Sequence, residues 1–470
     1  MESRRDFLKA SAAALTVAAT RPLFAANGAS HGGVQGANNR VRMAIIGAGN
    51  RGGRVFDSLA RHADCQFLAA AEVNKAKLDP WMTTARQTFK LDVVGDYRRI
   101  LDRKDIDAVL IATPDHWHSQ QTIDAISAGK DVYVEKPASN TILRLNAMLD
   151  AYKKGKQVVA VGTQQRSWDH FAEAKKVVDS GILGNITHVT IVQPGSYARP
   201  KEAEQPVPAG LDWDMWQGPA PKRPFKPSRL AFRGWYEYGG GLVADWGAHH
   251  VDVAHWFMGA DHQIPVKTAA TGAFLAVPDA DPEQVPDTFS ISWQYEKFLM
   301  TFANGEVYRA DEIEGWGVFF IGNRGSLQVN RMGWAVRPIV PRTQRKQGPP
   351  PPPTAGGVTL GAGGVAIAPA APGGPGGGRG RGGPGGGRGN DDRPPVELKV
   401  YVNPKGGVEE DYPLDAHTRN FLDCIKSRQK PASDMEIGYY AALPCILALE
   451  AIKQGKTLGW DAAARTSKVL

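Results

Sequence analysis

Residues 245 to 252 hold two carboxylates and a histidine at the spacing of one helix face. Asp245, His249 and Asp252 are four and three positions apart, so they line up in a helix that begins near Asp245. A histidine oriented by carboxylates can act as a general base near neutral pH. Two other interpretations stay open: Asp245 could be the N-cap of the helix, or these side chains could join His250 around a metal ion. We favour proton transfer and expect no metal, because His250 would point away from this face and no further ligand spacing supports a metal site.

A lysine follows a predicted strand in the first third of the chain. The run Asp131–Val134 predicts a strand, and Glu135-Lys136-Pro137 comes directly after it. An ammonium group can polarise a hydroxyl or carbonyl oxygen. A Glu-Lys pair at a strand end is usually only a surface ion pair. Here we expect Lys136 to be catalytic, because its strand leads to the sheet edge where the chain also predicts a nucleotide site.

The nucleotide site is predicted by the sequence between residues 41 and 54. The apolar run Met43–Ile46 ends in Gly47-Ala48-Gly49-Asn50-Arg51-Gly52, and a helix-like pattern follows. In this G-x-G-x-x-G spacing the first glycine permits the tight turn and the second lets the backbone approach a pyrophosphate. The third lets the helix pack closely on the strand. The alternative is a plain turn between a strand and a helix.

An acidic residue at the end of the next strand strengthens the nucleotide-site prediction. The strand Phe67–Ala71 ends at Glu72, about 20 residues beyond Gly52, where a carboxylate accepts hydrogen bonds from the adenosine ribose. Glu72 favours NAD, because a carboxylate would repel the 2′-phosphate of NADP, although Lys75 nearby leaves NADP open. The predicted cofactor contacts are Gly47, Gly49, Asn50, Arg51, Gly52, Glu72, Thr113, Pro114, His118, Glu135, Lys136 and Gln165.

Strands alternate with helices as far as residue 163. Ile106–Ala112 predicts a strand that ends at Thr113-Pro114, Ser119–Ala128 predicts a helix, and Val158–Val161 predicts the last strand. Parallel strands end in loops that line the ligand crevice, so we expect residues 115–118 at the rim of the cofactor site.

The pattern changes beyond residue 163. A helix is predicted at Phe171–Ser180, and strand-like segments recur at Thr187–Val192, Thr288–Trp293, Phe298–Phe302 and Val318–Ile321. Residues 198–236 are rich in proline and aromatic residues and predict a functional loop rather than core. Near the end of the chain, Leu414–Ser427 predicts an amphipathic helix and Ile437–Lys453 a second one, interrupted by Pro444.

The net charge of +8 comes mostly from two short regions. Residues 1–29 hold four Lys/Arg against two acids, and residues 341–395 hold seven against two, which leaves the rest of the chain close to neutral. The positive net charge therefore does not indicate that the protein binds nucleic acid. Residues 345–395 are so rich in proline, glycine and arginine that we expect a disordered insert. Its RGG-like runs resemble RNA-binding segments, but we favour a solvated loop and expect no nucleic-acid partner.

The N-terminus predicts export. Ser3-Arg4-Arg5-Asp6-Phe7-Leu8-Lys9 and the alanine-rich run after it match a twin-arginine signal, and a chance basic pair is the alternative. The apolar run is too short for a membrane span, and its cleavage site is unclear, so retention as an anchor stays open. Three cysteines, Cys65, Cys424 and Cys445, indicate no disulfide framework, as expected of a protein exported already folded.

Several of these motifs together resemble the Gfo/Idh/MocA oxidoreductases, which include glucose–fructose oxidoreductase and inositol dehydrogenase. The match runs over roughly residues 41–335 and 396–470 and rests on Gly47–Gly52, residues 112–118, Glu135-Lys136-Pro137, residues 211–221, Tyr238–Gly241 and residues 245–252. The later motifs resemble an exported bacterial branch.

The resemblance implies an α/β Rossmann domain followed by an α+β domain with an open, mostly antiparallel sheet. The substrate would lie between that sheet and the nicotinamide. We expect five parts: a signal at 1–29, a linker at 30–40, the Rossmann domain at 41–163, the substrate-binding domain at 164–344 and 396–470, and the insert at 345–395.

The resemblance also assigns roles to the residues singled out above. Asp245 and His249 match the family's catalytic aspartate and histidine, and with Lys136 they would handle the proton. Aromatic faces suit a sugar ring and an arginine suits its hydroxyls. The predicted substrate contacts are Arg166, Trp168, Tyr197, Trp235, Tyr236 and His249.

These observations predict hydride transfer between a sugar or cyclitol hydroxyl carbon and NAD, or NADP, in a homo-oligomeric enzyme. Two alternatives stay open. One is a relative that cleaves glycosides through transient oxidation at C3 and recycles its NAD, which export favours and the Asp245 to His249 motif disfavours. The other is a non-catalytic carbohydrate-binding protein, which the intact Lys136, Asp245 and His249 disfavour.

Overall fold

The computed structural model describes residues 40–78, 89–304, 315–339, 399–402 and 414–470. Both sheets belong to one compact unit, Val41–Leu470. The predicted signal, most of the linker and the insert at 345–395 lie outside the described residues.

The first sheet has six strands in the order β3-β2-β1-β4-β5-β6, all of them parallel. The strand order reverses between β1 and β4, and ligands of such sheets bind outside the carboxyl ends of the strands at this point. The strands are β1 (Val41–Ile46), β2 (Cys65–Ala71), β3 (Asp92–Val94), β4 (Ala108–Ile111), β5 (Asp131–Val134) and β6 (Val159–Val161).

Both faces of this sheet are covered, which explains why its strands are apolar throughout. Ile46 and Val109 pack on the side of α5 (Asp115–Ser127) and α6 (Ile142–Lys154). Ile45 and Leu110 pack on the side of α2 (Asn50–Ala60). A short helix, α4 (Arg98–Leu101), packs beside β2.

The second sheet has ten strands in the order β14-β13-β12-β11-β7-β10-β9-β8-β15-β16. Only the pair of β7 and β10 is parallel, so the prediction of an open, mostly antiparallel sheet is confirmed. The strands are β7 (Ile186–Val192), β8 (Lys267–Ala273), β9 (Thr288–Gln294), β10 (Leu299–Ala303), β11 (Gly317–Gly322), β12 (Gly325–Asn330), β13 (Gly333–Pro338), β14 (Lys399–Val402), β15 (Leu458–Asp461) and β16 (Thr466–Val469).

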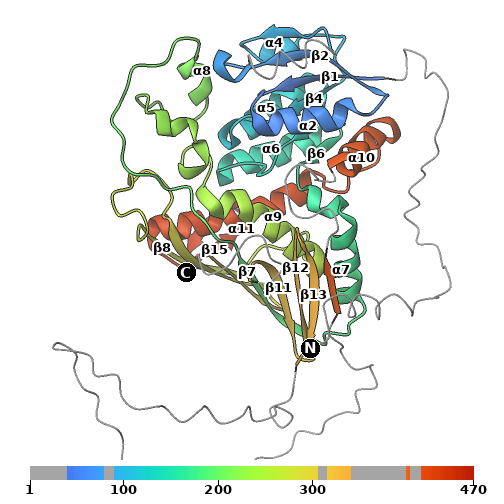
Figure 1. The fold of residues 1–470 in the computed structure, drawn as a ribbon, viewed down its shortest axis with the longest axis vertical. Helices are drawn as coiled ribbons and strands as arrows, with labels where there is room; N and C mark the ends of the chain where they lie inside the picture. The colour runs from blue at the N-terminus through green and yellow to red at the C-terminus, as the bar shows by residue number, and fades with distance from the viewer. Residues whose placement is uncertain (1–39, 79–88, 305–314, 340–398, 403–413) are drawn as a thin grey trace, which may run out of the picture. The chain divides into compact units, whose positions relative to one another are not determined.

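Two long helices lie between the sheets, as Figure 1 shows: α9 (Gly241–Met258) and α11 (Met435–Gln454). They pack against each other, and α11 also contacts α6 and β6 of the first sheet. The predicted interruption at Pro444 was wrong, because α11 continues through it. The Pro444 carbonyl accepts a hydrogen bond from Trp293 Nε1 at 3.0 Å, and the burial of Leu443, Cys445 and Leu447 offsets the cost of a proline inside a helix.

Helix α11 is long and apolar enough to cross a membrane by length and composition alone. Within the described residues it is the one such helix, and 72% of its apolar window is buried inside the fold. Its apolar character is therefore accounted for by packing between the two sheets.

Two more helices complete the structure around the sheets. Helix α7 (Asp169–Asp179) packs on β12 and β13 of the second sheet. Helix α10 (Leu414–Ser427) has the bounds predicted from its amphipathic pattern, but its apolar face packs on the first sheet's core beside α2. The C-terminal part of the chain therefore joins both cores, although we assigned all of it to the substrate-binding domain.

Residues 198–240 differ from the predicted loop because they have a core of their own. This segment contains α8 (Trp213–Gln217) and the 3-10 turns η3 (Pro227–Leu230) and η4 (Phe232–Gly234). Most of the aromatic side chains in this segment pack in one buried apolar cluster, whose members are Leu211, Trp213, Trp216, Ala220, Phe225, Trp235 and Tyr238.

Candidate active site

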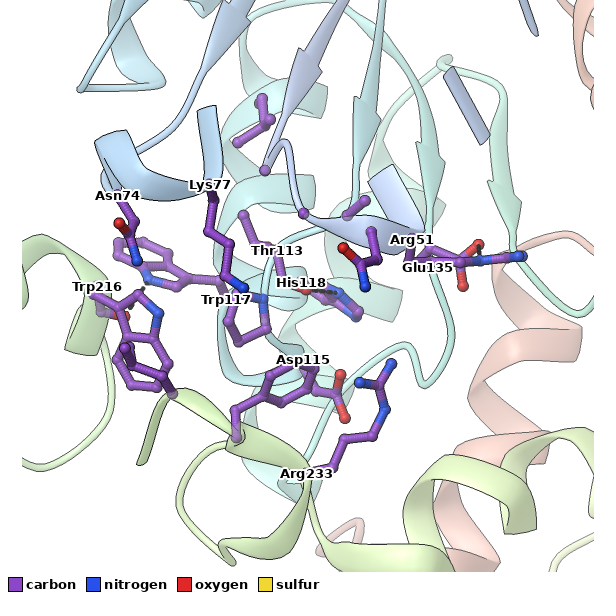
Figure 2. Close-up of a pocket in the computed structure, with 18 of the residues that line it drawn as sticks. Arg51, Asn74, Lys77, Thr113, Asp115, Trp117, His118, Glu135, Trp216 and Arg233 are labelled. Atoms are coloured by element: carbon purple, nitrogen blue, oxygen red, sulfur yellow. Dashed lines mark hydrogen bonds and ion pairs between the residues drawn. The ribbon is translucent and has the colours of Figure 1, made fainter. Parts of the chain in front are cut away.

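A cavity of about 590 Å³ lies at the carboxyl edge of the parallel sheet. Its walls come from the turns after β1, β2, β4 and β5, from segment 198–240, and from α9 (Figure 2). It therefore extends from the end predicted to hold a nucleotide to the residues predicted to be catalytic.

The glycine turn has the close contacts that its spacing predicts. Gly47 has a φ of +93°, and a Cβ there would lie 2.7 Å from the Thr113 nitrogen. A Cβ on Gly52 would lie 2.2 Å from the Gly47 carbonyl oxygen, so helix α2 approaches the turn too closely for any side chain. Gly49 lines the cavity, and no described atom lies within 4 Å of where its Cβ would be. This open cradle beside the start of α2 fits a pyrophosphate.

Glu72 is held at the end of β2 beside the glycine turn. Its carboxylate accepts hydrogen bonds from the backbone nitrogens of Ala48 and Asn74, both at 2.9 Å, and it lines the cavity. Burial raises the pKa of Glu72 from its ordinary 4.5. The carboxylate and the open cradle lie where an adenosine ribose and a pyrophosphate bind in this fold, so the residues present fit a dinucleotide.

The two glycines should respond differently to substitution. Gly52→Ala should lower the free energy of unfolding by about 1–3 kcal/mol, because its Cβ has no room against the Gly47 carbonyl. Gly49→Ala should leave stability nearly unchanged and weaken NAD binding, because its Cβ would occupy only the cradle. Chemical denaturation and a dinucleotide titration of both variants test this, and equal loss of stability in the two would contradict the assignment.

Lys136 and Asp245 form a buried ion pair on the cavity wall. The Lys136 ammonium donates to the Asp245 carboxylate and also to the Asp245 carbonyl oxygen at 3.1 Å. Tyr197 donates its hydroxyl to the same carboxylate, and Arg233 Nε lies 3.1 Å from it. Burial alone would raise the pKa of Asp245, but Lys136 and Arg233 lower it well below 3.8, so the carboxylate stays ionised.

Asp245 lies one turn inside α9, which begins at Gly241. It is therefore not the N-cap of the helix, which was the alternative interpretation. The left-handed conformation of Gly240, with φ +114°, starts the helix four residues before the predicted point.

His249 lies one turn after Asp245 and lines the same cavity. Burial, followed by the nearby charge of Lys136, lowers the pKa of His249 well below 6.5, so its imidazole is neutral. Its Nδ1 is buried and has no hydrogen-bond partner among the described residues.

The predicted orientation of His249 by Asp252 was wrong. The Asp252 carboxylate accepts a hydrogen bond from Arg166 Nε at 2.7 Å in a buried ion pair and does not line the cavity. His250 bonds to the Gln193 side chain at 3.0 Å. Within the described ranges, no group of three or more His, Cys, Asp or Glu side chains could hold a metal ion.

Glu135 connects the glycine turn to the lysine. Its carboxylate accepts a hydrogen bond from Arg51 Nε at 2.8 Å and one from the Lys136 backbone nitrogen at 3.3 Å. The His118 ring lies between the carbonyl oxygens of Pro137, at 2.7 Å, and Thr113, at 2.8 Å. These contacts fix the ends of β4 and β5 relative to each other.

Most of the predicted cofactor contacts line the cavity. They are Gly47, Gly49, Asn50, Arg51, Glu72, Thr113, Pro114, His118, Glu135 and Lys136. Gly52 lies behind the turn, and Gln165 is buried outside the cavity, because the 3-10 turn η2 (Gln164–Ser167) turns Gln164 toward it instead.

Four of the predicted substrate contacts lie outside the cavity. Arg166 is paired with Asp252 and Asp261, and Trp168 packs in the core of the second sheet. Trp235 is 1% exposed within segment 198–240, and Tyr236 packs on the core of the second sheet. Aromatic residues in proline-rich segments often pack in the core, and the sequence alone could not distinguish such packing residues from ligand contacts. Tyr197 and His249 do line the cavity.

The cavity also contains residues that sequence reasoning did not assign. Arg233 and Arg331 line it, and the Arg331 guanidinium lies 4.1 Å from the ring centre of Trp246. Burial raises the pKa of Asp115, at the start of α5, to about 7. Figure 2 shows its carboxylate beside Arg233. Asp115 was expected at the rim of the cofactor site without a role of its own, whereas Arg233 and Arg331 had no signal in the sequence.

This fold and site define a dinucleotide-dependent oxidoreductase. Two models of one family match the chain: an "oxidoreductase family, NAD-binding Rossmann fold" over residues 41–163 and an "oxidoreductase family, C-terminal alpha/beta domain" over residues 169–319. The chain belongs to the Gfo/Idh/MocA oxidoreductase family, and its first domain is an NAD-binding Rossmann domain.

Individual relatives are distant. The chain is 25% identical over 290 residues to the uncharacterized oxidoreductase YrbE of Bacillus subtilis, which is 61% of this chain and 73% of that one. It is 26% identical over 242 residues to an inositol 2-dehydrogenase of Rhizobium meliloti, 50% of this chain and 59% of that one. The crystal structure of the WlbA dehydrogenase from Bordetella pertussis, in complex with NADH and UDP-GlcNAcA, superposes with a TM-score of 0.57. That match has 15% identity and covers 90% of this chain and 98% of WlbA.

Proposed function

We propose that this protein oxidises a hydroxyl-bearing carbon of a sugar or cyclitol, with NAD as hydride acceptor. The observation that carries the proposal is the meeting of the Lys136–Asp245 ion pair and His249 in the cavity that also contains the glycine turn and Glu72. The name of the inositol 2-dehydrogenase relative supports a cyclitol or a similar polyol as the class of substrate.

In this proposal His249 and Lys136 have different roles at the substrate hydroxyl. Bound NAD would supply the hydride acceptor. His249, whose imidazole is neutral because its pKa lies well below 6.5, accepts the proton of the substrate hydroxyl. Lys136 stabilises the negative charge that develops on that oxygen.

Asp245 has a positioning role in this proposal. It receives hydrogen bonds from Lys136 and Tyr197 and an ion pair from Arg233, so its carboxylate is already held by three neighbouring side chains. Its charge instead holds the ammonium at the cavity wall, and Glu135 holds the backbone of the same lysine. Because several contacts hold the Lys136 ammonium, it keeps the position relative to the substrate oxygen that hydride and proton transfer require.

We propose NAD rather than NADP as the natural cofactor. The Glu72 carboxylate faces the cavity beside the glycine turn and would repel a 2′-phosphate. Lys75, which left NADP open, does not line the cavity, and its backbone nitrogen bonds to Gly210. A titration of the protein with each dinucleotide tests the preference.

We also propose that the protein is exported by the twin-arginine route. The proposal rests on Ser3-Arg4-Arg5-Asp6-Phe7-Leu8-Lys9 and on the three cysteines, which are buried and free. Replacing Arg4 and Arg5 by Lys and fractionating cells tests it. Retention of the variant inside the cytoplasm is expected, and unchanged export would contradict it.

A panel of sugars and cyclitols tests the activity. The protein is loaded with NAD, each compound is added, and NADH fluorescence is recorded for bound and free dinucleotide together. We expect NADH with at least one compound that has a secondary hydroxyl. Release of an aglycone from aryl glycosides without net NADH would support glycoside cleavage instead, and NAD binding without any turnover would support a non-catalytic binder.

A further inference from the structure

Residues 210–218, called here the adenosine cover, contribute Met215 and Trp216 to the cavity wall, and Figure 2 shows Trp216 near Asn74. We propose that this cover slows the release of the bound dinucleotide, so that NADH leaves the protein only when the cover opens. The inference concerns the adenosine half of the cavity and rests on the NAD-binding domain, so it does not depend on the identity of the sugar or cyclitol.

Backbone pairing joins the cover to the end of β2. The Lys75 nitrogen donates to the Gly210 carbonyl and the Asp212 nitrogen donates to the Val73 carbonyl, both at 3.0 Å. Asn74 and Leu211 form an antiparallel bridge between these two bonds. The pairing begins one residue after Glu72, which is the expected contact of the ribose. The cover is thus fixed directly beside the adenosine end of the site.

Helix α5 holds the other end of the cover. The Trp117 indole nitrogen donates to the carbonyls of Met215 and Trp216, at 3.1 and 3.0 Å. His116 Nε2 also lies 2.9 Å from the Trp216 carbonyl. Figure 2 shows Trp117 and Trp216 beside Asn74 on one side of the cavity. Indole rings and short apolar side chains are suitable walls for a flat adenine base.

The cover is a packed element and not a loose loop. Trp213 stacks on Trp216 with ring centres 4.8 Å apart, and Leu211 and Trp213 belong to the core of segment 198–240. The side chain of Val73, from the other side of the pairing, packs against this core. Opening the cover would expose these indoles to water, so the closed state is strongly favoured.

Gly218 permits the closest approach between the cover and the Rossmann domain. Its φ is +48°, and a Cβ there would lie 2.0 Å from Cζ2 of Trp117. Any side chain at this position must therefore displace the indole that holds the cover. Gly218 itself does not line the cavity, so its substitution changes the cover without removing a cofactor contact.

A bound dinucleotide beneath this cover can leave only when the cover opens, and the dissociation rate then follows the opening. We expect wild-type protein to keep its dinucleotide through gel filtration, as identified by mass spectrometry. Gly218→Val and Trp213→Leu, neither of which removes a residue of the cavity wall, should raise the NADH dissociation rate by about tenfold or more, because they disturb the packing that keeps the cover closed.

The matched control is Lys222→Ala. Lys222 is exposed and pairs with Asp214 on the outer side of the same segment, so its loss should leave the dissociation rate unchanged. Dissociation is measured by mixing NADH-loaded protein with excess NAD in the absence of any sugar. The proposal is overturned if wild type exchanges NADH as fast as Trp213→Leu, or if both cover variants match wild type.

Amide hydrogen exchange in the wild-type protein tests the same proposal without any variant, so it applies even if the cover variants fold poorly. In NADH-loaded wild type, the amides of Lys75 and Asp212 should exchange no faster than NADH dissociates. Exchange of both amides well before NADH leaves would overturn the proposal. These measurements contain no sugar, so a result that contradicts the cover does not contradict the proposed sugar or cyclitol oxidation. In the same way, a sugar panel that yields no NADH does not contradict slow release of the dinucleotide.

Discussion

Replacing Lys136 by Met lowers kcat by about 10³-fold, which is the expected loss when a group that stabilises charge in the transition state is removed. The ammonium of Lys136 is the donor that the proposed mechanism places at the substrate oxygen. Met has a similar length, and Asp245 keeps its contacts with Arg233 and Tyr197, so the cavity should stay intact. Dinucleotide affinity should change little, since Glu72 and the glycine turn are untouched.

The matched control is Lys130→Met, at the other end of the same strand. Lys130 is buried, and its ammonium donates to the carbonyls of Arg103 and Ile106 at 2.6 and 2.8 Å. Its loss should cost stability and leave kcat close to wild type. Steady-state kinetics, dinucleotide titration and thermal unfolding of both variants separate the two effects. If Lys136→Met keeps kcat within about tenfold of wild type, the lysine is not at the reacting centre.

Acid should destabilise the protein steeply below pH 6. Burial lowers the pKa of eight histidines in the part of the chain that the structure describes, so they hold a proton less readily in the folded protein than in the unfolded chain, which takes up a proton at each below about pH 6.5. Five of them are His116, His170 and His417, with pKa about 4, and His250 and His255, with pKa about 3. Their contribution to stability is therefore lost as the pH falls.

Buried acids with raised pKa values act in the opposite direction. Burial raises the pKa of Asp115 to about 7 and that of Asp252 to about 6, so between pH 6 and 4 the folded protein binds two protons that the unfolded chain releases. The histidine protons that favour unfolding outnumber the carboxyl protons that favour folding. The free energy of unfolding should then fall between pH 6 and 4, by about 1.4 kcal/mol per pH unit for each proton that the unfolded chain binds in excess of the folded protein.

Denaturant unfolding at several pH values measures this slope. His255→Gln removes one of these histidine protons and should reduce the slope by about 1.4 kcal/mol per pH unit. His262→Gln, at an exposed position, should leave the slope unchanged. A free energy of unfolding that stays level or rises from pH 6 to 4 would show that these histidines are not buried as neutral groups.

The predicted site residues that the structure brings together in the cavity are those whose positions depend on one turn or one strand end. Gly47 and Gly52 lie where the backbone leaves no room for a side chain, and a few neighbouring residues determine that geometry. Glu72 follows a strand whose end is predicted by its apolar pattern. Asp245 and His249 are one helix turn apart and therefore reach the same cavity.

The errors concerned choices among partners distant in sequence. Asp252 shares a helix with His249, but Arg166 is 86 residues away and pairs with it instead. Trp235 and Tyr236 lie in a stretch whose aromatic content suggested a ligand surface, but both pack in the protein core. Arg233 lines the cavity although nothing in the sequence predicted it.

Local spacing in the amino-acid sequence thus determined the class of fold, the glycine turn and the identity of the chemical groups, because backbone sterics and strand periodicity act over a few residues. Tertiary structure alone decided which carboxylate holds Lys136, which aromatic residues line the cavity, and that residues 210–212 pair with residues 73–75 after β2. Those outcomes depend on which side chains from separate segments compete for the same buried partner, and that competition exists only once both sheets and the helices between them are packed.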